Sequence, residues 1–406
     1  MIPFSPPHIT DAAIAEVVSA LKSGWITTGP RTRKLEEELN AYCNANATLC
    51  LNSATAGLEL MLRWFGVKEG DEVILPAYTY AATANVVMHC GAKPVLVDVN
   101  AEDFNINIDA ARKAVTERTK VIMPVDIGGW PCDYDALNAL VEEVKSTSKP
   151  NHPNQQRLGR ILVLSDAAHS LGATYNGKRT GTLADATVFS FHAVKNFTTA
   201  EGGAVCLNLP ISFSTDDVVK ALRTKALHGQ NKDALAKTQK GNWEYDIVEA
   251  GYKWNMPDVL AAIGLASLKD YDETLQRRKQ IVEQYDSFFR KQDWCEAPMF
   301  KTDDKQSCHH LYMLRLKNVS EQQRNAVIQK IFDREVSVNV HFKPLPLLSY
   351  YKGLGYNISD YPVAYDNYCR EISLPVYFGL TDEQVETVCN AVKASVEEVL
   401  QPTAVR

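Results

Sequence analysis

The sequence contains no apolar run near the roughly 20 residues that a membrane-spanning helix requires. Its first residues, Met1 to Pro7, show neither a basic cluster nor a long apolar stretch, so we expect no secretory signal peptide. A basic excess is also absent, because 43 Lys and Arg stand against 49 Asp and Glu, a net charge of −6. Proteins dedicated to nucleic acid are normally basic. We therefore expect a cytoplasmic protein that binds neither nucleic acid nor a membrane.

Paired cysteine motifs are missing as well. The nine cysteines are scattered between Cys43 and Cys389 without a C-x-x-C pair, which is typical of reduced, buried thiols in a cytosolic protein. The segment Cys308-His309-His310 has metal-binding residue types but no second ligand pair at a usual spacing. We interpret this segment as structural and expect no metal site.

The nucleotide-binding loops are incomplete. Gly172 to Lys178 fits G-x-x-x-x-G-K, but Arg179 stands where a P-loop needs Ser or Thr for Mg²⁺. The pair Asn176-Gly177 instead predicts a tight hairpin turn. A G-x-G-x-x-G between a predicted strand and a predicted helix is not found either.

The first half of the chain contains predicted strands and helices in alternation. The length of 406 residues predicts two or three domains, with 45% hydrophobic and 23% charged residues as in ordinary globular proteins. Several strand candidates, such as Ile161 to Leu164, are continuous apolar runs, which is typical of a mostly parallel sheet covered on both faces. The expected strands are 47–52, 72–75, 94–99, 120–125, 160–164, 186–191 and 203–207; the expected helices are 11–24, one from 53, 81–90, 109–116 and 133–145.

The pattern changes beyond Met256. A helical region over 259–290 is followed by strand candidates at 310–316 and 336–342, and then by a helix from Asp382 with Thr381 and Gln384 as its capping box. This arrangement predicts a second, smaller α+β domain. The polar stretch 144–160 predicts an exposed loop between a helix and the next strand.

Two residues at the ends of apolar strands suggest chemistry. Asp166 ends one of them, where α/β enzymes place functional groups. The alternative is a purely structural role as a helix N-cap. Lys195 follows the strand that contains Ser190. Burial beside an apolar strand end lowers the pKa of a lysine, as Schiff-base chemistry requires, although a lysine considered alone is more often a surface residue.

Considered as a set, these residues favour pyridoxal phosphate chemistry. That chemistry needs a lysine amine, a carboxylate that keeps the pyridine nitrogen protonated, a phosphate cradle at a helix N-terminus, and a flat group on the ring. The sequence offers Lys195, Asp166, the small-residue turn 52–57, and Tyr78 and Tyr80 after the next strand.

Further blocks extend this pattern along the chain, at 24–30, 52–55, 76–85, 91–99, 166–169, 189–203, 228–229, 251–256 and 340–342. In these blocks the chain resembles the DegT/DnrJ/EryC1/StrS sugar aminotransferases, within the aspartate-aminotransferase (fold type I) superfamily. The resemblance implies an α/β fold with a mostly parallel, seven-stranded sheet in a large cofactor domain, 1–255, and a smaller α+β C-terminal domain, 256–406. It also implies a homodimer with its sites at the subunit interface.

The resemblance assigns roles to individual residues. Lys195 is the Schiff-base lysine and the general base and acid, and Asp166 pairs with the pyridine nitrogen. His169 lies near the ring hydroxyl, and Tyr80 stacks on the ring. The other expected cofactor contacts are Ser53, Ala54, Thr55, Ser190, Lys253 and Asn255; the expected substrate contacts are Ile26, Thr27, His341 and Phe342.

One block departs from the family pattern. Lys253 and Asn255 stand where Asn and Arg are commoner in the family. In the family this block crosses the dimer interface to the partner subunit's cofactor phosphate, so we expect Lys253 to reach it as a point charge.

The implied reaction moves an amino group from L-glutamate, through pyridoxamine phosphate, to a keto sugar linked to a nucleoside diphosphate. A 4-keto sugar linked to UDP, dTDP or GDP, in amino-sugar or polysaccharide biosynthesis, is the leading hypothesis. The alternatives are a 3-keto sugar or cyclitol acceptor, a sugar dehydratase, and a non-catalytic relative. The dehydratases of the family have His at the position of Lys195, which argues against that branch.

Overall fold

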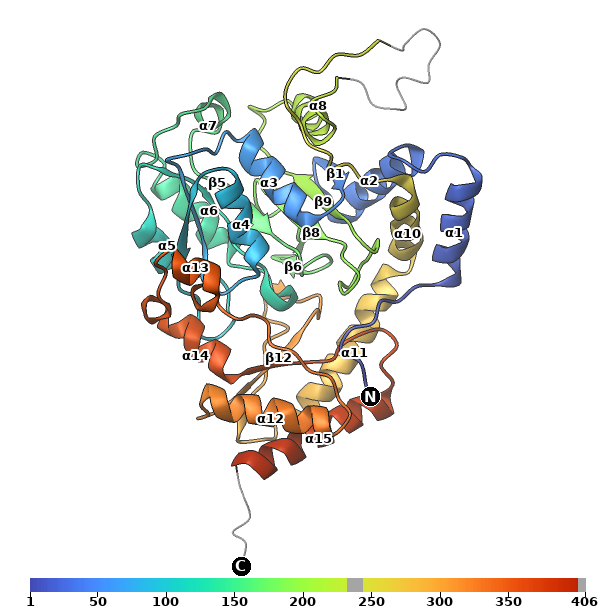
Figure 1. Cartoon of the computed structure of the whole chain (residues 1–406), viewed down its shortest axis with the longest axis vertical. Helices are drawn as coiled ribbons and strands as arrows, with labels where there is room; N and C mark the ends of the chain where they lie inside the picture. The colour runs from blue at the N-terminus through green and yellow to red at the C-terminus, as the bar shows by residue number, and fades with distance from the viewer. Residues whose placement is uncertain (232–243, 401–406) are drawn as a thin grey trace, which may run out of the picture.

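The computed structural model describes residues 1–231 and 244–400 (Figure 1). The strands are β1 Ala47–Leu51, β2 Glu72–Pro76, β3 Lys93–Val97, β4 Thr119–Ile122, β5 Leu162–Asp166, β6 Thr174–Tyr175, β7 Lys178–Arg179, β8 Ala186–Ser190, β9 Gly203–Leu207, β10 Cys295–Glu296, β11 Lys305–Gln306, β12 Tyr312–Leu316 and β13 Glu371–Leu374. The α-helices are α1 Asp11–Lys22, α2 Pro30–Cys43, α3 Ala54–Trp64, α4 Ala81–His89, α5 Ile108–Ala114, α6 Tyr134–Glu143, α7 Pro153–Leu158, α8 Thr215–Ala226, α10 Asp258–Lys269, α11 Tyr271–Phe289, α12 Glu321–Asp333, α13 Ser349–Gly353, α14 Pro362–Arg370 and α15 Asp382–Leu400.

A seven-stranded sheet in the order β1-β9-β8-β5-β4-β2-β3 forms the centre of the upper part in Figure 1. Strand β9 pairs antiparallel with both β1 and β8, and the pairs among β8, β5, β4, β2 and β3 are parallel. The α/β fold with a mostly parallel seven-stranded sheet is therefore confirmed. Parallel strands align their carboxyl ends along one edge of a sheet, which is where functional groups gather in such folds.

Both faces of this sheet are covered, as the continuous apolar strands predict. Leu75 and Val73 of β2 point into a core formed with α3, α4 and α8, whereas Ile74 between them points into a core formed with α5 and α6. A third core joins Cys50, Phe189 and Cys206 of the sheet to α2 and α10. Successive side chains alternate between the faces, so a strand buried on both must be apolar throughout.

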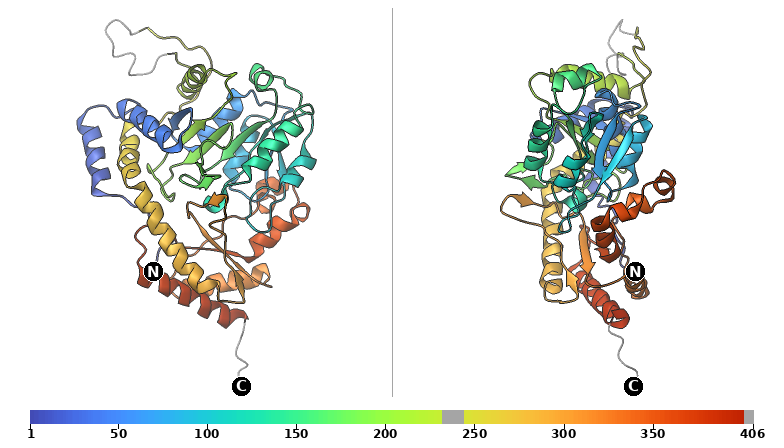
Figure 2. Two further views of the ribbon diagram at one scale, coloured as in Figure 1. Left: turned by 180° about the vertical axis from the view of Figure 1, so that it is seen from behind. Right: turned by 90° about the vertical axis from the view of Figure 1, so that its left-hand side faces the viewer.

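A second, separate core lies in the lower part of Figure 1. The antiparallel sheet β10-β12-β13 packs there with α11, α12 and α15, and Ile2 joins the same core. Helix α11 runs from the upper part to the lower one, as the two views of Figure 2 show. The domain boundary at 255/256 stays a prediction. Helix α10 follows that boundary in the sequence but packs against α1 and α2 of the upper part.

Local motifs expected from the sequence form as predicted at several points. The hairpin of β6 and β7 turns at Asn176 and Gly177, whose φ angles are 48° and 72°. At the start of α15 the Gln384 N–H donates to Thr381 Oγ1 at 3.2 Å, and the Thr381 N–H donates to Gln384 Oε1 at 3.0 Å. These reciprocal bonds form the expected capping box.

Two expected elements differ from the structure. The stretch 144–160 is not simply an exposed loop, because it contains α7, and Gln155 of α7 is buried and donates to the Phe65 carbonyl at 3.1 Å. The expected strand 336–342 forms only single bridges, Ile2 with Val336 and Asn339 with Ser373. The His341 N–H donates to the Glu371 carboxylate at 3.0 Å, so at this residue a side chain takes the place of a strand partner.

Membrane-spanning helices are not found in the described part of the chain, where no helix combines the necessary length and apolar character.

The capping box allows a test of the second core. We expect Thr381→Ala to lower the free energy of unfolding by about 1 kcal/mol, because it leaves a first-turn N–H of α15 without its acceptor. The midpoint of urea unfolding measures the change. Thr387→Ala, on the exposed face of the same helix, is the control and should leave the midpoint nearly unchanged. An equal effect of both substitutions would contradict a specific role of the cap.

Candidate active site

A cavity of about 370 Å³ opens at the carboxyl edge of the seven-stranded sheet. The segments after β2, β5 and β8 supply much of its wall, the start of α3 another part, and the N-terminal residues and the segment near 341 the remainder. Of the predicted site residues it brings together Ser53, Ala54, Thr55, Tyr80, Asp166, His169, Ser190, Lys195, His341 and Phe342.

Lys195 lies in the turn that follows β8, where its N–H donates to the His192 carbonyl at 2.9 Å. Removal of water from the amine lowers its pKa to about 8, although the negative charge of Asp166 acts in the opposite direction. Since an ordinary lysine has a pKa near 10.4, a much larger share of this amine is neutral at physiological pH. The side chain therefore has the nucleophilic and basic character that covalent amine chemistry requires.

Asp166 is the last residue of β5 and is buried. Thr83 Oγ1 of α4 donates to its Oδ2 at 2.8 Å, and the Ala168 N–H donates to Oδ1 at 3.3 Å. Thr79 in turn lies 2.8 Å from the Thr83 hydroxyl. Burial raises the pKa of Asp166, and these donors oppose the rise. The carboxyl group is thus held in one orientation at the bottom of the cavity.

The turn before α3 has the geometry of an anion cradle. Ser53 is the N-cap of this 11-residue helix, and its hydroxyl accepts from the Ala56 N–H at 3.1 Å. The first N–H groups of the helix, at Ala54 and Thr55, belong to residues that line the cavity. Strand β9 passes directly below: a Cβ on Gly203 would lie 2.5 Å from the Ala54 nitrogen. Any residue with a side chain at position 203 would displace the turn before α3.

Four histidines line the cavity, and burial lowers the pKa of three of them, His169, His310 and His341. His169 and His310 lie with ring centroids 4.4 Å apart. The Gly128 N–H donates to His169 Nδ1 at 3.2 Å, so the proton of the neutral His169 ring is on Nε2. The pKa of His341 falls to about 3, with the charge of Lys195 as a further cause. All three rings are neutral at physiological pH.

Aromatic side chains close the mouth of the cavity. Tyr80 is 65% exposed, and its ring centroid lies 5.8 Å from that of Phe342. Phe4, from the N-terminal segment, stacks on His341 at 5.5 Å. A flat molecule in the cavity would therefore have aromatic neighbours.

The four other predicted residues lie outside this cavity. Ile26 and Thr27 belong to the loop after α1, and this loop contacts the segment that holds Lys253 and Asn255. The Asp258 N–H donates to the Thr27 carbonyl at 3.1 Å, and Asn255 Nδ2 donates to Thr28 Oγ1 at 2.5 Å. The loop after α1 and the segment before α10, which are far apart in the sequence, are thus neighbours.

Phe4 and His310 line the cavity and Thr83 lies behind Asp166, and the sequence pattern does not predict these places. Phe4 has no recognisable signal in the sequence. Thr83 lies on α4 one turn after Tyr80, and its hydroxyl faces Asp166, which only the position of α4 against β5 decides. The sequence predicts only a structural role for His310, yet this residue lines the cavity. Its Nδ1 lies 2.7 Å from Asn196 Oδ1, whereas Cys308 donates to the His169 carbonyl at 2.8 Å.

The described residues fit pyridoxal phosphate. Three groups meet at one cavity. They are a lysine of lowered pKa, a buried carboxyl group held by hydrogen bonds, and a helix N-terminus that packs closely against Gly203 of β9. Their chemistry matches the amine, the pyridine partner and the phosphate cradle that the cofactor requires.

Known proteins are similar to this chain over most of its length. The model of the DegT/DnrJ/EryC1/StrS aminotransferase family matches residues 7–393. The spore coat polysaccharide biosynthesis protein SpsC of Bacillus subtilis is 36% identical over 97% of this chain and 96% of its own. The UDP-4-amino-4-deoxy-L-arabinose–oxoglutarate aminotransferase of Shewanella sediminis is 34% identical over 86% and 85%.

Among solved structures, Spr1654 of Streptococcus pneumoniae, assigned as a sugar aminotransferase, is similar in its form with pyridoxamine phosphate. The TM-score is 0.96 at 48% identity, with 98% of this chain and 100% of the other covered. The form of the same protein with pyridoxal phosphate has a TM-score of 0.94.

Gly203 provides a test of the cradle. We expect Gly203→Ala to weaken the binding of pyridoxal phosphate to the cofactor-free protein by about tenfold or more, because the methyl group displaces the N–H groups of Ala54 and Thr55. Equilibrium dialysis measures the affinity. Gly353→Ala is the matched control, since a Cβ there meets nothing within 4 Å. Unchanged affinity in Gly203→Ala would show that the cradle does not hold the phosphate.

Proposed function

The chain belongs to the DegT/DnrJ/EryC1/StrS aminotransferase family, and from this premise we propose that it transfers the amino group of L-glutamate to a 4-keto sugar linked to a nucleoside diphosphate. The observation that carries the proposal is the meeting of Lys195, Asp166 and the turn at Ser53 at one cavity. The relatives support the choice of substrate. One is named for a UDP-linked 4-amino sugar and oxoglutarate, and another acts in polysaccharide biosynthesis.

The chain's residues divide the work between binding and proton transfer. Pyridoxal phosphate, when bound, supplies the electron sink that stabilises charge at the carbon next to the transferred nitrogen. Asp166 keeps a proton at the far end of that system. Lys195 accepts a proton at Nζ from the substrate and returns it elsewhere, for which a pKa near 8 is suited. The neutral histidines orient oxygen atoms without adding charge.

Lys195 also decides between two branches of the family. A dehydratase of this family has histidine at this position, and a lysine amine is what reversible covalent attachment of the cofactor requires. An aminotransferase is the better match for the cavity.

The experiment begins with the colour of the protein. We expect the purified holoenzyme to absorb visible light, and L-glutamate to bleach that absorbance as the amino group is taken up. A keto sugar nucleotide should then restore the band, and a panel of 4-keto and 3-keto compounds identifies the acceptor. Lys195→Ala should remove both the native band and turnover.

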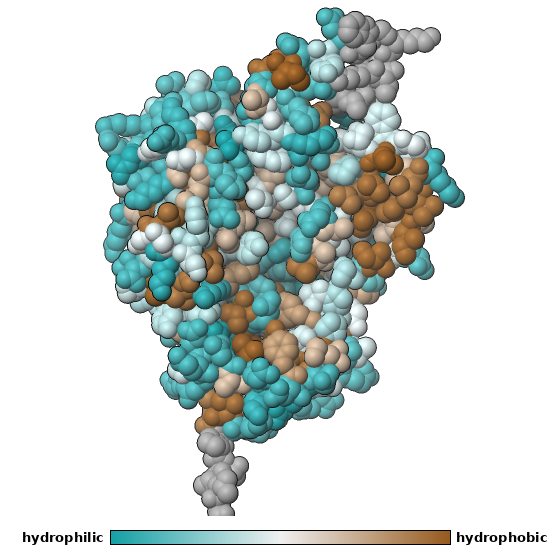
Figure 3. Space-filling model, in the orientation of Figure 1, coloured by the Kyte–Doolittle hydropathy of each residue, from teal (hydrophilic) through white to brown (hydrophobic). Residues whose placement is uncertain are grey.

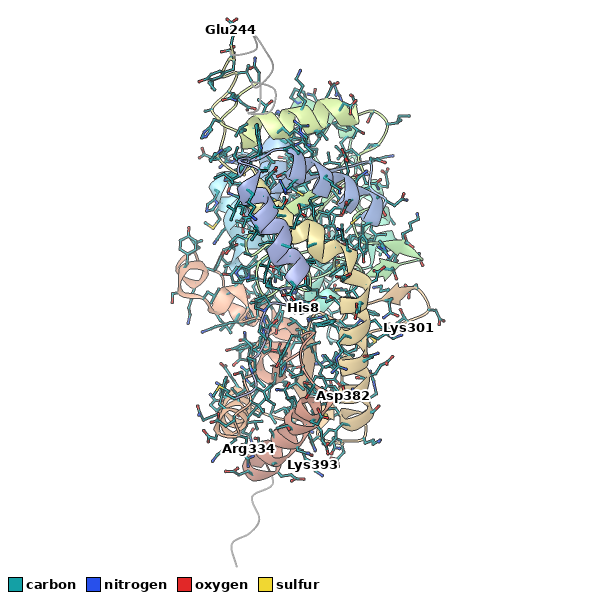
Figure 4. The ribbon with its side chains drawn as sticks, turned by 90° about the vertical axis from the view of Figure 1, so that its right-hand side faces the viewer. His8, Glu244, Lys301, Arg334, Asp382 and Lys393 are labelled. Carbon is teal, nitrogen blue, oxygen red and sulfur yellow. The ribbon has the colours of Figure 1, made fainter. Side chains whose placement is uncertain are left out.

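The control for Lys195→Ala is Lys301→Ala. Lys301 is exposed on the loop between β10 and β11, away from the cavity (Figure 4). This variant should keep the colour and the rate of the unaltered protein. A bleachable band that survives Lys195→Ala would refute the assignment of the lysine, and a band that no keto sugar restores would refute the acceptor class.

We also propose that two copies of the chain share each site. Ile26, Thr27, Lys253 and Asn255 do not line the chain's own cavity, and Asn255 Oδ1 is buried without a hydrogen-bond partner among the described residues. An apolar patch over α1 supports a covered surface nearby (Figure 3). Its exposed side chains on α1 are Ile14, Val18 and Leu21. A partner subunit that presents Lys253 to the cavity would add a positive charge for a phosphate.

Hybrid dimers test the shared site. We expect Lys195→Ala and Lys253→Ala proteins to be nearly inactive alone, but a refolded mixture to regain activity in proportion to the hybrids formed. In a hybrid, one of the two sites receives Lys195 from one subunit and Lys253 from the other. Mixing Lys195→Ala with itself is the control. If no mixture regains activity while Lys253→Ala alone is impaired, Lys253 acts within its own subunit.

A further inference from the structure

Behind the cavity wall, a hydrogen-bonded chain connects His341 to a fully buried carboxyl group. His341 Nδ1 lies 2.9 Å from Ser373 Oγ, and Ser373 Oγ lies 2.5 Å from Glu371 Oε1. The other oxygen, Glu371 Oε2, accepts the His341 N–H at 3.0 Å. Glu371 and Ser373 are both on β13 and have no exposed surface. Neither lines the cavity, so both act on a ligand only through His341.

The geometry leaves one nitrogen of His341 for a ligand. Nδ1 is engaged by Ser373, and Nε2 has no hydrogen-bond partner among the described residues. His341 itself lines the cavity. Because burial and the charge of Lys195 lower its pKa to about 3, the ring is neutral and carries one proton, on one nitrogen or the other.

We propose that Glu371 and Ser373 are positioning residues that determine whether His341 Nε2 donates or accepts a hydrogen bond in the cavity. With Glu371 protonated, its O–H donates to Ser373, the Ser373 O–H donates to His341 Nδ1, and the ring proton is on Nε2. With Glu371 ionised, the Ser373 O–H donates to the carboxylate and the ring donates from Nδ1 to Ser373. Nε2 is then an acceptor.

The exchange of states balances in protons. Glu371 gives its proton to Ser373 Oγ, Ser373 gives its own to His341 Nδ1, and the proton on Nε2 leaves to water. One proton is lost in all, and the negative charge appears on Glu371 and not on the ring. The inference rests on the proposed function for its substrate. The acceptor's keto and phosphate oxygens accept hydrogen bonds, so the site requires Nε2 as a donor.

The surroundings place this exchange near physiological pH. Burial raises the pKa of Glu371 to about 8, while the positive charge of Arg324 on α12 opposes the rise. Arg324 also donates to the Glu371 backbone carbonyl at 2.7 Å. Tyr78 also interacts electrostatically with Glu371, and because burial raises the pKa of Tyr78 it is neutral. Facing His341 are Lys195 and the neutral rings of His169 and His310.

The direction of the pH effect follows from these groups. Below about pH 8 the Glu371 carboxyl is mostly protonated and Nε2 is a donor. Above it the carboxyl ionises and the donor is lost. The KM for the sugar acceptor should therefore rise by about five- to tenfold as the pH increases through this range, the effect of one hydrogen bond. Since Lys195 has a pKa in the same range, it changes kcat as well, and the unaltered enzyme alone does not isolate the relay.

Glu371→Gln isolates the effect. The amide keeps a donor towards Ser373 and an acceptor for the His341 N–H at every pH, so it imitates the protonated carboxyl. We expect its KM for the acceptor to stay low across the range while kcat keeps the pH dependence of Lys195. Ser373→Ala breaks the chain, and its KM should become independent of pH because Glu371 no longer acts on the ring. Ser395→Ala, a buried serine that bonds within α15, is the control for loss of a buried hydroxyl.

A spectroscopic measurement tests the relay without turnover. In protein labelled with ¹⁵N-histidine, the shift of Nε2 shows directly whether that nitrogen carries a proton, and His341→Phe identifies the signal. We expect Nε2 to be protonated at low pH and unprotonated at high pH in the unaltered holoenzyme, and protonated throughout in Glu371→Gln. Identical His341 spectra for the two proteins at every pH would overturn the relay, even if transamination occurs. A switch in the spectra without turnover of any keto sugar would leave the relay standing and refute the proposed function instead.

Discussion

Burial of both faces of the seven-stranded sheet is the constraint on which the rest of the structure depends. Helices α3, α4 and α8 cover one face, and α2, α5, α6 and α10 cover the other. The sheet is thereby exposed only along its edges and ends. Because most of the strands are parallel, their carboxyl ends deliver Asp166 and Ser190 to the same edge, and the loop after Ser190 brings Lys195 there. The position of the cavity therefore follows from the arrangement of the sheet between its two layers of helices.

Burial of the side chains around that cavity determines their charges. Loss of hydration lowers the pKa of Lys195 and raises that of Asp166, and it keeps His169, His310 and His341 neutral. Each group is pushed towards its uncharged form, so small changes in hydrogen bonding alter which atom holds a proton. An enzyme that moves protons between neighbouring atoms benefits from groups whose charged and uncharged forms are close in free energy. The buried chain through Ser373 to Glu371 extends the same principle behind the wall.

The two cores meet at this cavity. The sheet supplies Lys195 and Asp166, whereas His341 and Phe342 come from the extended segment beside β13 of the second sheet. Phe4 reaches the same place because Ile2 is fixed against Val336 and packs in the second core. The proposed substrate contacts His341 and Phe342 therefore come from a different part of the chain than Lys195.

Local sequence determined much of this protein. Continuous apolar runs predicted the covered sheet, Ser53 predicted the start of α3, and Asn176-Gly177 and Thr381 with Gln384 predicted a turn and a cap, because these features depend on neighbours in the chain. Lys195 and Asp166 were recognisable from their places after apolar strands together with the family's motif blocks. The segment 144–160 was only partly foreseen, since α7 is stabilised by contacts with the distant end of α3.

Tertiary structure alone decided the rest. Thr83 bonds to Asp166, and Ser373 and Glu371 stand behind His341, through contacts between elements far apart in the sequence. Position 336–342 has the apolar pattern of a strand, yet the Glu371 carboxylate, and not a neighbouring backbone, takes the His341 N–H. Sequence pattern records which side chains are buried. Which buried groups bond to one another depends on how the layers pack, and this packing determines the protonation of the site.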